Sequence, residues 1–351
     1  MIFKKITAAF VSFLLISECC ISYAVGTVVP ASAVETPSKK VTFLAMDTAM
    51  ELTVYGDRCE EAAAAAQEEI ERLDSLWSIG SEDSEISQLN AQRSMVVSED
   101  TFELLREAVE VSEIVDGLFD VSVYPIMLAW GFTGDEFRVP GDDELASLLP
   151  LVDYTKISFD DDTLTITLEG DTQVEVGGIA KGYTSARIVD IFEEYDITCG
   201  LINLGGNIEC YHKKTDGSDW RIGIQNPDST LIDADYAGIV SISDKCAITS
   251  GGYERYFEED GIRYHHIIDP RTGKPADSGL ISVTIVSEDP ALADGLSTSL
   301  FIMGLSDAIN FWRECPADFD FILIDDDGNI YVSAGLEDSY SCDLDYDIIY
   351  L

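Results

Sequence analysis

The segment Glu175-Val176-Gly177-Gly178-Ile179-Ala180-Lys181-Gly182-Tyr183 predicts a strand that runs through two glycines directly into a helix. The strand is expected at residues 172–176, and the helix at residues 182–195, where Ile188, Val189 and Phe192 have helical spacing. Such a turn lets the backbone approach a phosphate or expose a carbonyl to a metal, and a helix start favours anions. The segment has neither the Walker spacing nor a GxGxxG fingerprint, so a tight connection without a ligand is the alternative interpretation.

Helices and strands are mixed on both sides of this segment, without strict alternation and without a repeat of fixed period. Helices are expected at residues 60–76, 101–115 and 290–303. Strands are expected at residues 41–55, 163–168, 200–210, 220–225, 238–242, 281–286, 321–325 and 329–332, with breaks at Gly205-Gly206 and Asn226-Pro227. No Pro- or Ser-rich linker interrupts residues 41–351, so we predict one α+β domain there, with mixed or antiparallel sheets and flanking helices, after a linker at residues 34–40.

The chain is strongly acidic, with 66 Asp and Glu against 21 Lys and Arg and a formal charge of −45. This charge repels phosphate backbones, because nucleic-acid affinity depends mainly on Lys and Arg, so nucleic acid is not expected as a partner. An anionic ligand would have to be met locally, by a metal ion or by backbone amides.

Residues 1–33 have the pattern of an export segment. Lys4 and Lys5 precede an apolar run at residues 6–16 that is shorter than a typical membrane-spanning helix. Lipid attachment at Cys19 or Cys20, cleavage after Ala33 and a retained membrane anchor are the three interpretations. All of them place the domain outside the cytoplasm, either at the outer face of the cell membrane as a lipoprotein or secreted after cleavage near Ala33.

The remaining cysteines are scattered singly, with no CxxC pair and no His-rich neighbourhood, which argues against a zinc site. We interpret them as small buried hydrophobic residues. Disulfides are permitted by the expected compartment, but their pairing does not follow from the spacing.

The segment Ala291-Leu292-Ala293-Asp294-Gly295-Leu296-Ser297-Thr298-Ser299-Leu300-Phe301 places three oxygen-bearing side chains on one face of a predicted helix. Asp294, Ser297 and Thr298 stand at positions i, i+3 and i+4. One carboxylate with neutral hydroxyls suits Mg²⁺, which keeps positions open for water and substrate phosphate. The alternative is that Asp294 caps the helix and both hydroxyls face solvent.

Two of the three histidines stand beside an Asp-Pro turn in Arg263-Tyr264-His265-His266-Ile267-Ile268-Asp269-Pro270. Histidine is the side chain best able to accept a proton near neutral pH, so either is a candidate general base. A hydrogen-bonded core histidine is the alternative interpretation for each. The third, His212, lies beside Lys213 and Lys214 and is expected at the surface.

These three segments occur in the order and spacing of the ApbE family, the FAD:protein FMN transferases, which the chain resembles over roughly residues 41–340. Further motifs carry the resemblance: Leu44-Ala45-Met46-Asp47-Thr48, Asp83-Ser84-Glu85-Ile86-Ser87-Gln88-Leu89-Asn90, Asp116-Gly117-Leu118-Phe119-Asp120, Trp130-Gly131-Phe132, Leu204-Gly205-Gly206-Asn207 and Thr249-Ser250-Gly251. The resemblance implies a single compact domain of the ApbE type, which is T-fold-like.

The resemblance also implies which residues form the site. The FAD site would consist of Met46, Leu118, Phe119, Asp120, Glu175, Lys181 and Ile268. The metal site would consist of Asp294, Thr298 and the Gly178 carbonyl, with Ser297 close by. His266 would be the general base, and Lys181 would balance the charge of the leaving phosphate.

The chain departs from the family pattern at three positions. Asp47 replaces a usual glycine, Glu175 replaces a usual aspartate, and Gly80 stands where many members carry an aromatic that would stack on the isoalloxazine. Loss of a stack costs on the order of 1 kcal/mol. Trp77 and Tyr124 are the two candidates to replace it.

The reaction implied by the resemblance is Mg²⁺-dependent cleavage of FAD, with FMN attached through a phosphoester bond to a Thr or Ser of another protein and AMP released. The acceptor would be an exported or membrane-bound redox protein. Two alternatives stay open: an FAD pyrophosphatase that forms FMN and AMP with water, and an exported flavin-binding protein without catalysis.

Overall fold

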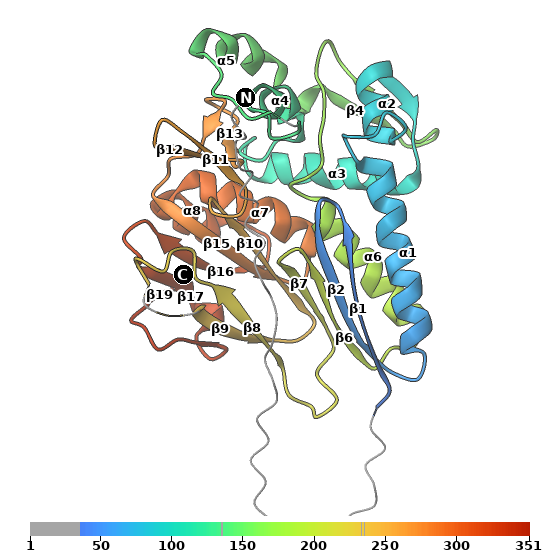
Figure 1. Ribbon diagram of the computed structural model, residues 1–351, viewed down its shortest axis with the longest axis vertical. Helices are drawn as coiled ribbons and strands as arrows, with labels where there is room; N and C mark the ends of the chain where they lie inside the picture. Colours follow the sequence, from blue (N-terminus) through green and yellow to red (C-terminus); the bar gives the residue numbers. More distant parts are fainter. Residues whose placement is uncertain (1–35, 135, 233, 235) are drawn as a thin grey trace, which may run out of the picture. The chain divides into compact units, whose positions relative to one another are not determined.

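A nine-stranded sheet, in the order β1-β2-β6-β7-β10-β15-β16-β17-β19, forms the central layer of the computed structural model (Figure 1). The structure describes residues 36–134, 136–232, 234 and 236–351, and residues Thr36–Leu351 form one compact unit. Neighbouring strands are antiparallel except β17 and β19, which are parallel. The prediction of an α+β fold with mixed sheets and flanking helices is confirmed. The strands are β1 (Ser38–Ala45), β2 (Thr48–Tyr55), β6 (Cys199–Leu204), β7 (Asn207–Tyr211), β10 (Lys245–Gly251), β15 (Leu280–Ser287), β16 (Asp320–Asp325), β17 (Ile330–Ser333) and β19 (Asp347–Ile349).

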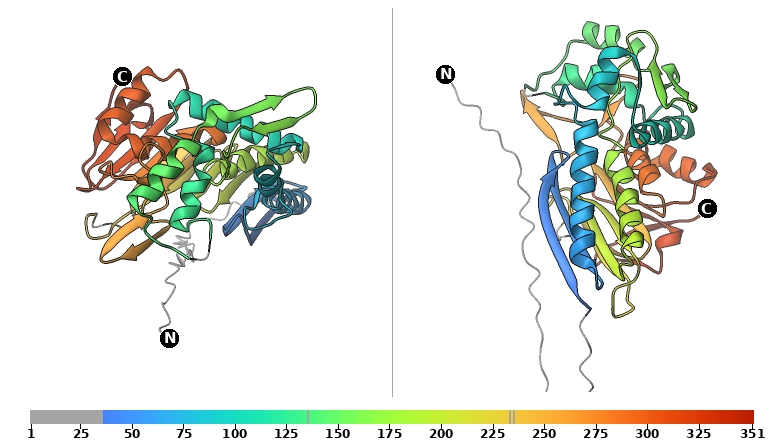
Figure 2. Two further views of the ribbon diagram at one scale, coloured as in Figure 1. Left: turned by 90° about the horizontal axis from the view of Figure 1, so that it is seen from above. Right: turned by 90° about the vertical axis from the view of Figure 1, so that its right-hand side faces the viewer.

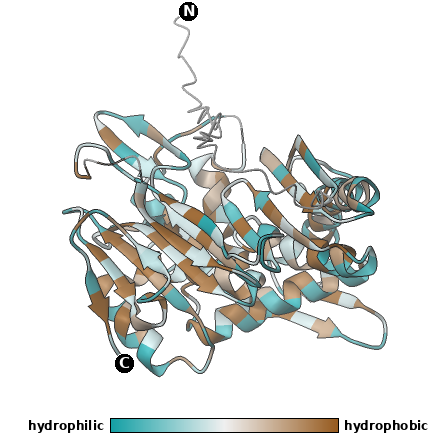
Figure 3. Ribbon diagram, turned by 90° about the horizontal axis from the view of Figure 1, so that it is seen from below, coloured by the Kyte–Doolittle hydropathy of each residue, from teal (hydrophilic) through white to brown (hydrophobic). Residues whose placement is uncertain are grey.

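The sheet is apolar on both faces. Along β16, Phe321 and Leu323 belong to the core beneath the helices, whereas Ile322 and Ile324 belong to the core on the other face. Three helices lie on the first face: α6 (Ala180–Glu194), α7 (Pro290–Met303) and α8 (Leu305–Glu314). A separate three-stranded sheet contributes to the second core and consists of β8 (Trp220–Gln225), β9 (Tyr236–Ile242) and β18 (Tyr340–Ser341). Figure 3 shows the hydrophobic residues gathering along the strands.

Smaller elements complete the fold around this layer. Figure 2 (right) shows α1 (Cys59–Trp77) running alongside the β1–β2 hairpin, with α6 next to it. The others are α2 (Glu85–Gln92), β3 (Ser94–Val96), α3 (Glu99–Ile114), α4 (Tyr124–Trp130), α5 (Asp142–Leu148), β4 (Ile157–Asp160), β5 (Thr165–Leu168), β11 (Tyr256–Glu259), β12 (Ile262–His265), β13 (Ile268–Asp269) and β14 (Lys274–Pro275).

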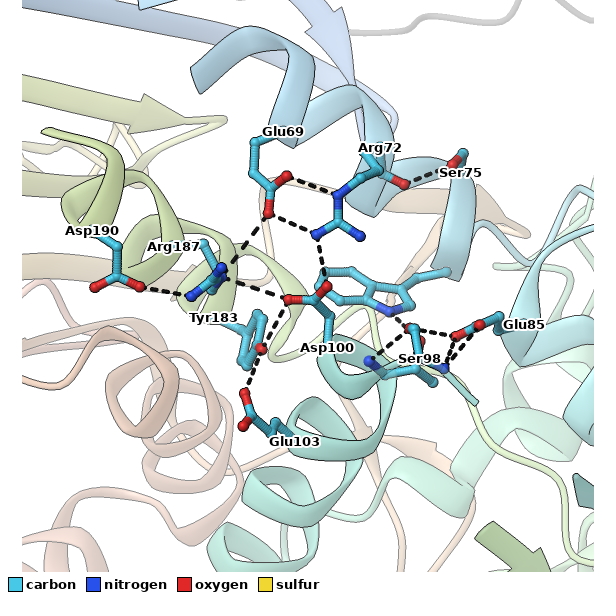
Figure 4. A network of polar contacts seen from close by, with 12 residues as sticks. Glu69, Arg72, Ser75, Glu85, Ser98, Asp100, Glu103, Tyr183, Arg187 and Asp190 are labelled. Carbon is cyan, nitrogen blue, oxygen red and sulfur yellow. Dashed lines mark hydrogen bonds and ion pairs between the residues drawn. The ribbon is translucent and has the colours of Figure 1, made fainter. Parts of the chain in front are cut away.

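A polar network joins α1, α3 and α6 (Figure 4). Arg72 of α1 donates to Glu69 and to Asp100 of α3, both at 2.7 Å. Tyr183 of α6 donates from its hydroxyl to Glu103 at 3.1 Å, and Arg187 lies 3.5 Å from Asp100. Helix α6, which follows the glycine turn, is therefore attached to α3 through Tyr183 and Arg187, and Asp100 of α3 joins it to Arg72 of α1.

The single strand predicted at residues 41–55 is wrong, because the chain folds there into the β1–β2 hairpin. Met46 and Asp47 form the turn, with φ of 47° and 59°, and Ala45 pairs with Thr48. Neither residue is the glycine or asparagine that usually marks such a turn, and the alternating pattern continues through it. The first strand begins at Ser38, so the last residues of the predicted linker belong to the sheet.

The strand predicted at residues 172–176 is also wrong, because a side chain takes the hydrogen bonds that a neighbouring strand would make. Asn90 of α2 donates from Nδ2 to the Val174 carbonyl and accepts from the Val174 amide, both at 2.7 Å. The Glu175 amide donates to the Val121 carbonyl at 2.9 Å. The segment therefore belongs to no strand.

The export signal predicted at residues 1–33, with Cys19 and Cys20, lies outside the described residues. Within the part of the chain that the structure describes, no helix combines the length and apolar character needed to cross a bilayer. The six cysteines in that part are unpaired, and Cys59, Cys199, Cys210 and Cys246 are buried, as the sequence predicted for small hydrophobic residues.

Candidate functional site

The glycine turn and the start of α7 come together because glycine at position 182 lets their backbones meet. A Cβ atom on Gly182 would lie 2.2 Å from the Pro290 carbonyl oxygen, so only glycine fits there. Asp294 of α7 accepts a 2.9 Å hydrogen bond at Oδ2 from the Gly182 amide. Two segments separated by 112 residues thus form one site.

The same hydrogen bond leaves a carbonyl available in the glycine turn. In a helix that began earlier, the Gly182 amide would bond to the Gly178 carbonyl, but here it bonds to Asp294. Within the described residues, the Gly178 carbonyl accepts no hydrogen bond. Gly178 itself lies against the Phe119 ring, whose Cε2 would be 3.0 Å from an added Cβ.

The Asp294 carboxylate is buried beside one cation. It is 4% exposed, and Lys181 Nζ lies 3.9 Å from Oδ1. Burial raises the pKa of Asp294, whereas Lys181, the Asn207 amide and the Gly182 N–H lower it. The Asn207 amide lowers the pKa of Asp294 without a formed hydrogen bond, because its buried Nδ2 has no hydrogen-bond partner within the described part of the chain.

Three hydroxyl groups lie next to one another beside Asp294. Ser297 donates from Oγ to the Asp294 carbonyl at 2.8 Å and lies 2.7 Å from Ser250 Oγ of β10. Ser250 Oγ is also 3.3 Å from Thr298 Oγ1. Ser297 is fully buried and Thr298 is half-buried, so the expectation that both hydroxyls face solvent is wrong.

The residues present suit a hard cation such as Mg²⁺. The groups around Asp294 are one carboxylate, hydroxyls and the unbonded Gly178 carbonyl, all of them oxygen donors. No three His, Cys, Asp or Glu side chains gather as a metal cage anywhere in the described ranges. A cation here would therefore keep several positions for water or substrate oxygens.

The two neighbouring histidines have different roles in the structure. His265 accepts at Nδ1 from the Ile267 amide at 3.2 Å, so its Nε2 carries the proton and donates to the Ala276 carbonyl at 3.0 Å. It is the hydrogen-bonded core histidine. His266 donates from Nδ1 to the Arg255 carbonyl at 3.1 Å, which leaves the Nε2 lone pair as its proton acceptor. Burial and the Arg255 charge lower the pKa of His266 to about 3, so the imidazole is neutral.

Arg255 and Glu254 neighbour the same groups, and neither was predicted from the sequence. Arg255 donates to the Phe132 carbonyl, and its charge lowers the pKa of Glu175 and of His266. Burial raises the pKa of Glu254 to about 7, Lys181 lowers it and Asp294 raises it. Both residues lie in a turn without a motif, so the sequence carried no signal for them.

The other predicted FAD contacts lie around the same turn. Glu175 accepts at Oε2 from the Gly177 amide at 2.8 Å. Met46 is half-buried, with Sδ 4.0 Å from Thr184 Oγ1 of α6, and Leu118 packs against the same core as Phe119.

Two predicted contacts also have clear structural roles. Asp120 accepts at Oδ1 from the Ser122 amide at 2.8 Å and at Oδ2 from the Tyr154 amide at 3.0 Å. The Ile268 side chain is buried in a cluster with Trp130 and Phe132. Contact of either residue with FAD stays a prediction.

A cavity of about 180 Å³ lies beside the extended segment that leads to the glycine turn. Its walls are Ile79, Ser87, Asn90, Ala91, Tyr124 and Gln173. Trp77, one of the two candidates for a stacking residue, does not reach it. Trp77 is 4% exposed and donates from Nε1 to Thr101 at 3.0 Å, so that candidate is wrong.

The fold and the site define an α+β protein with oxygen donors and one lysine beside a helix start, and with a neutral histidine bonded to the Arg255 carbonyl. The ApbE family profile matches residues 46–323 of this chain. An FAD:protein FMN transferase of Treponema pallidum is 31% identical over 316 residues, which are 84% of this chain and 86% of that protein. One of Vibrio cholerae is 34% identical over 241 residues, 67% of this chain and 71% of that protein. The chain belongs to the ApbE family.

Solved structures agree with this assignment. The ApbE protein of Thermotoga maritima has a TM-score of 0.79 at 30% identity, over 85% of this chain and 98% of that one. The flavin transferase ApbE of Vibrio cholerae has a TM-score of 0.75 at 27% identity, over 86% of this chain and the whole of that one.

Proposed function

We propose that this chain is a Mg²⁺-dependent FAD:protein FMN transferase, which cleaves FAD, attaches FMN to a Thr or Ser of another protein and releases AMP. Membership of the ApbE family supports the transferase activity. The observation that carries the chemistry is the buried Asp294 carboxylate, which accepts from the Gly182 amide at the start of α6 and lies 3.9 Å from Lys181. This arrangement joins a carboxylate, a cation and a helix start where a pyrophosphate can be held.

The proposed metal ligands are Asp294, Thr298 and the Gly178 carbonyl, with Ser297 supporting them through Ser250. Mg²⁺ bound there would neutralise charge on the pyrophosphate oxygens. Lys181 would hold the leaving AMP phosphate, because its ammonium group lies beside Asp294. Met46, the segment Leu118, Phe119 and Asp120, and Glu175 and Ile268 are the proposed contacts of FAD.

His266 is the proposed general base. Its neutral imidazole would accept the proton of the acceptor hydroxyl at Nε2, while Nδ1 stays bonded to the Arg255 carbonyl. The hydroxyl oxygen would form a bond to the FMN phosphorus as the pyrophosphate P–O bond to AMP breaks, with the two oxygens in line.

The deciding experiment is incubation of the purified chain with FAD and Mg²⁺, with and without a candidate acceptor domain. AMP release and the mass of the acceptor are followed together. An acceptor that gains one FMN, with AMP release that depends on it, supports the transferase. AMP with free FMN and no acceptor gain indicates the pyrophosphatase, which the open space beside Gly80 favours as the second candidate. Neither product indicates a flavin-binding protein.

We further propose that the chain is exported, with residues 1–33 as the signal and the catalytic domain reaching to residue 351. Lys4, Lys5 and the apolar run at residues 6–16 support export, with lipid attachment at Cys19 or Cys20 or cleavage near Ala33. The acceptor would then be an exported or membrane-bound redox protein. Fractionation of cells that express the chain tests this: recovery in the cytoplasm at full length contradicts it, and a Cys19→Ala, Cys20→Ala variant released from the membrane supports lipidation.

A further inference from the structure

We propose that Tyr124 is the platform on which this chain stacks the isoalloxazine ring of FAD, inside the cavity beside the glycine turn. The proposal rests on the proposed function, because it supposes that FAD is the ligand. It assigns a ring-binding and positioning role to a residue outside the metal and base groups described above.

The cavity lies at a suitable distance from the proposed phosphate site. Gln173 in its wall stands four residues before Gly177, and four residues span at most about 14 Å even when fully extended. A flavin whose phosphate meets the glycine turn can therefore place its ring in this cavity.

Tyr124 is the aromatic residue among the six that line the cavity. The remaining walls combine the apolar side chains of Ile79 and Ala91 with the polar side chains of Ser87, Asn90 and Gln173. An aromatic face with apolar neighbours suits a planar ring, and an amide such as Gln173 suits its polar edge.

The phenol of Tyr124 is free for such a contact. The side chain is half-buried, and its hydroxyl has no hydrogen-bond partner within the described residues. Tyr124 begins α4, followed by Pro125, so its backbone is held at the helix start. Burial and then the Glu175 charge raise the pKa of Tyr124, which keeps the phenol neutral.

Other aromatic residues near the site are already occupied. Trp77 is buried and packs edge-on against Tyr183, with ring centroids 5.6 Å apart. Phe119 is 6% exposed and lies against Gly178. Phe132 is fully buried. Gly80 follows Ile79 of the cavity wall, and only Ser78 Oγ would come within 4 Å of an added Cβ, so a side chain there would have room.

The experiment measures FMN fluorescence and FAD affinity with the purified full-length chain and its variants. A stacked phenol quenches flavin emission, so Tyr124→Phe is expected to keep affinity and Tyr124→Leu to weaken FAD binding about fivefold and relieve the quenching. Gly80→Tyr in the Tyr124→Leu background is expected to restore both by supplying a ring from the neighbouring wall. Tyr350→Leu, an exposed tyrosine beside β19, is the matched control.

Unchanged quenching and affinity in Tyr124→Leu would overturn the proposal, since the ring would then lie elsewhere. The same holds if Tyr350→Leu has an equal effect. Failure of the proposed transferase function can be distinguished from failure of the stacking role, because the first is measured as FMN transfer to the acceptor and the second as FMN emission. If FMN emission depends on Tyr124 but no acceptor gains FMN, then the stacking role stands and the proposed function fails. If the acceptor gains FMN equally well with both leucine variants and with unchanged affinity, then the function stands and the stacking role fails.

Discussion

Individual residues decide the chemistry of this site through the atoms that their neighbours leave available. Asp294 has one oxygen bonded to the Gly182 amide and the other facing Lys181 at 3.9 Å. His266 has Nδ1 bonded to a backbone carbonyl and Nε2 available. The adjacent His265 has both nitrogens bonded, which is why neighbouring residues of the same type have different roles.

Substitution Asp294→Asn should lower turnover by roughly two to three orders of magnitude while the fold survives. Asparagine keeps an oxygen that can accept from the Gly182 amide but removes the charge that a cation needs. AMP release from FAD measures the effect. The matched control is Asp289→Asn on the same helix, where the side chain caps the Leu292 amide at 3.0 Å and turnover should stay near wild type. Equal losses in both variants would contradict the metal assignment.

His266→Gln should lower turnover on the order of a hundredfold or more, and the exposed His212→Gln should not.

The pKa of His266 is lowered from 6.5 to about 3, so in the folded protein the imidazole stays neutral throughout that range. The unfolded chain binds a proton there that the folded chain does not, so this residue's contribution to the free energy of unfolding falls as pH falls from 6.5 to 3. Thermal unfolding of wild type and His266→Gln across this range should show a smaller acid loss in the variant.

At the level of secondary structure, the close approach of α6 and α7 creates the site. Helix α7 forms from local signals: the Asp289 cap, Pro290 in its first turn and Gly304 at its end. None of these signals predicts that α6 and α7 meet. Gly182 makes that contact possible, because it lets the Pro290 carbonyl approach the α6 backbone.

Gly182→Ala should destabilise the protein by about 2–4 kcal/mol and abolish turnover, because the added Cβ would stand 2.2 Å from the Pro290 oxygen and separate the helices. Chemical denaturation and AMP release measure the two effects. Gly141→Ala, where a Cβ meets nothing within 4 Å, should change stability by no more than about 0.5 kcal/mol. Wild-type stability in Gly182→Ala would show that the helices do not pack as described.

Strand β7 carries a buried acid that should make stability depend on pH. Glu209 is 6% exposed, and burial raises its pKa from 4.5 to about 8. The folded carboxyl holds its proton where the unfolded one has lost it, so its stabilising contribution is present below pH 4.5 and is lost as pH rises through 8. Glu209→Gln should therefore raise the free energy of unfolding near pH 8 relative to wild type, on the order of a few kcal/mol. Calorimetry at several pH values tests this, with exposed Glu258→Gln as the control.

The whole molecule carries a charge of −45, and this charge opposes an anionic substrate. A bound cation and Lys181 are the local features that offset the repulsion. Chelation of Mg²⁺ should therefore abolish turnover and weaken FAD binding, and the weakening should be larger at low salt, where the field is less screened. Titration calorimetry with and without chelator at two salt concentrations measures this. An FAD affinity that changes with neither the chelator nor the salt concentration would contradict the proposed role of the cation.

Local patterns were sufficient for elements whose ends carry caps or turns. The helix at Pro290–Met303 and the strand at Trp220–Gln225 have the predicted bounds. Predictions failed where another part of the chain decided the outcome. Asn90 bonds to Val174 and keeps that segment out of a sheet, and the Met46–Asp47 turn contains neither glycine nor asparagine.

The sequence by itself determined the fold class, the family and the oxygen-rich face of α7, because periodicity, glycine turns and motif spacing are properties of nearby residues. Only the tertiary structure decided that Asp294 meets the Gly182 amide, that Ser250 joins Thr298, and that Arg255 stands near Glu175 and His266. These contacts depend on how helices and strands pack. The proposal of Tyr124 rather than Trp77 depends on packing for the same reason, since Trp77 is buried whereas the half-buried Tyr124 lines the cavity.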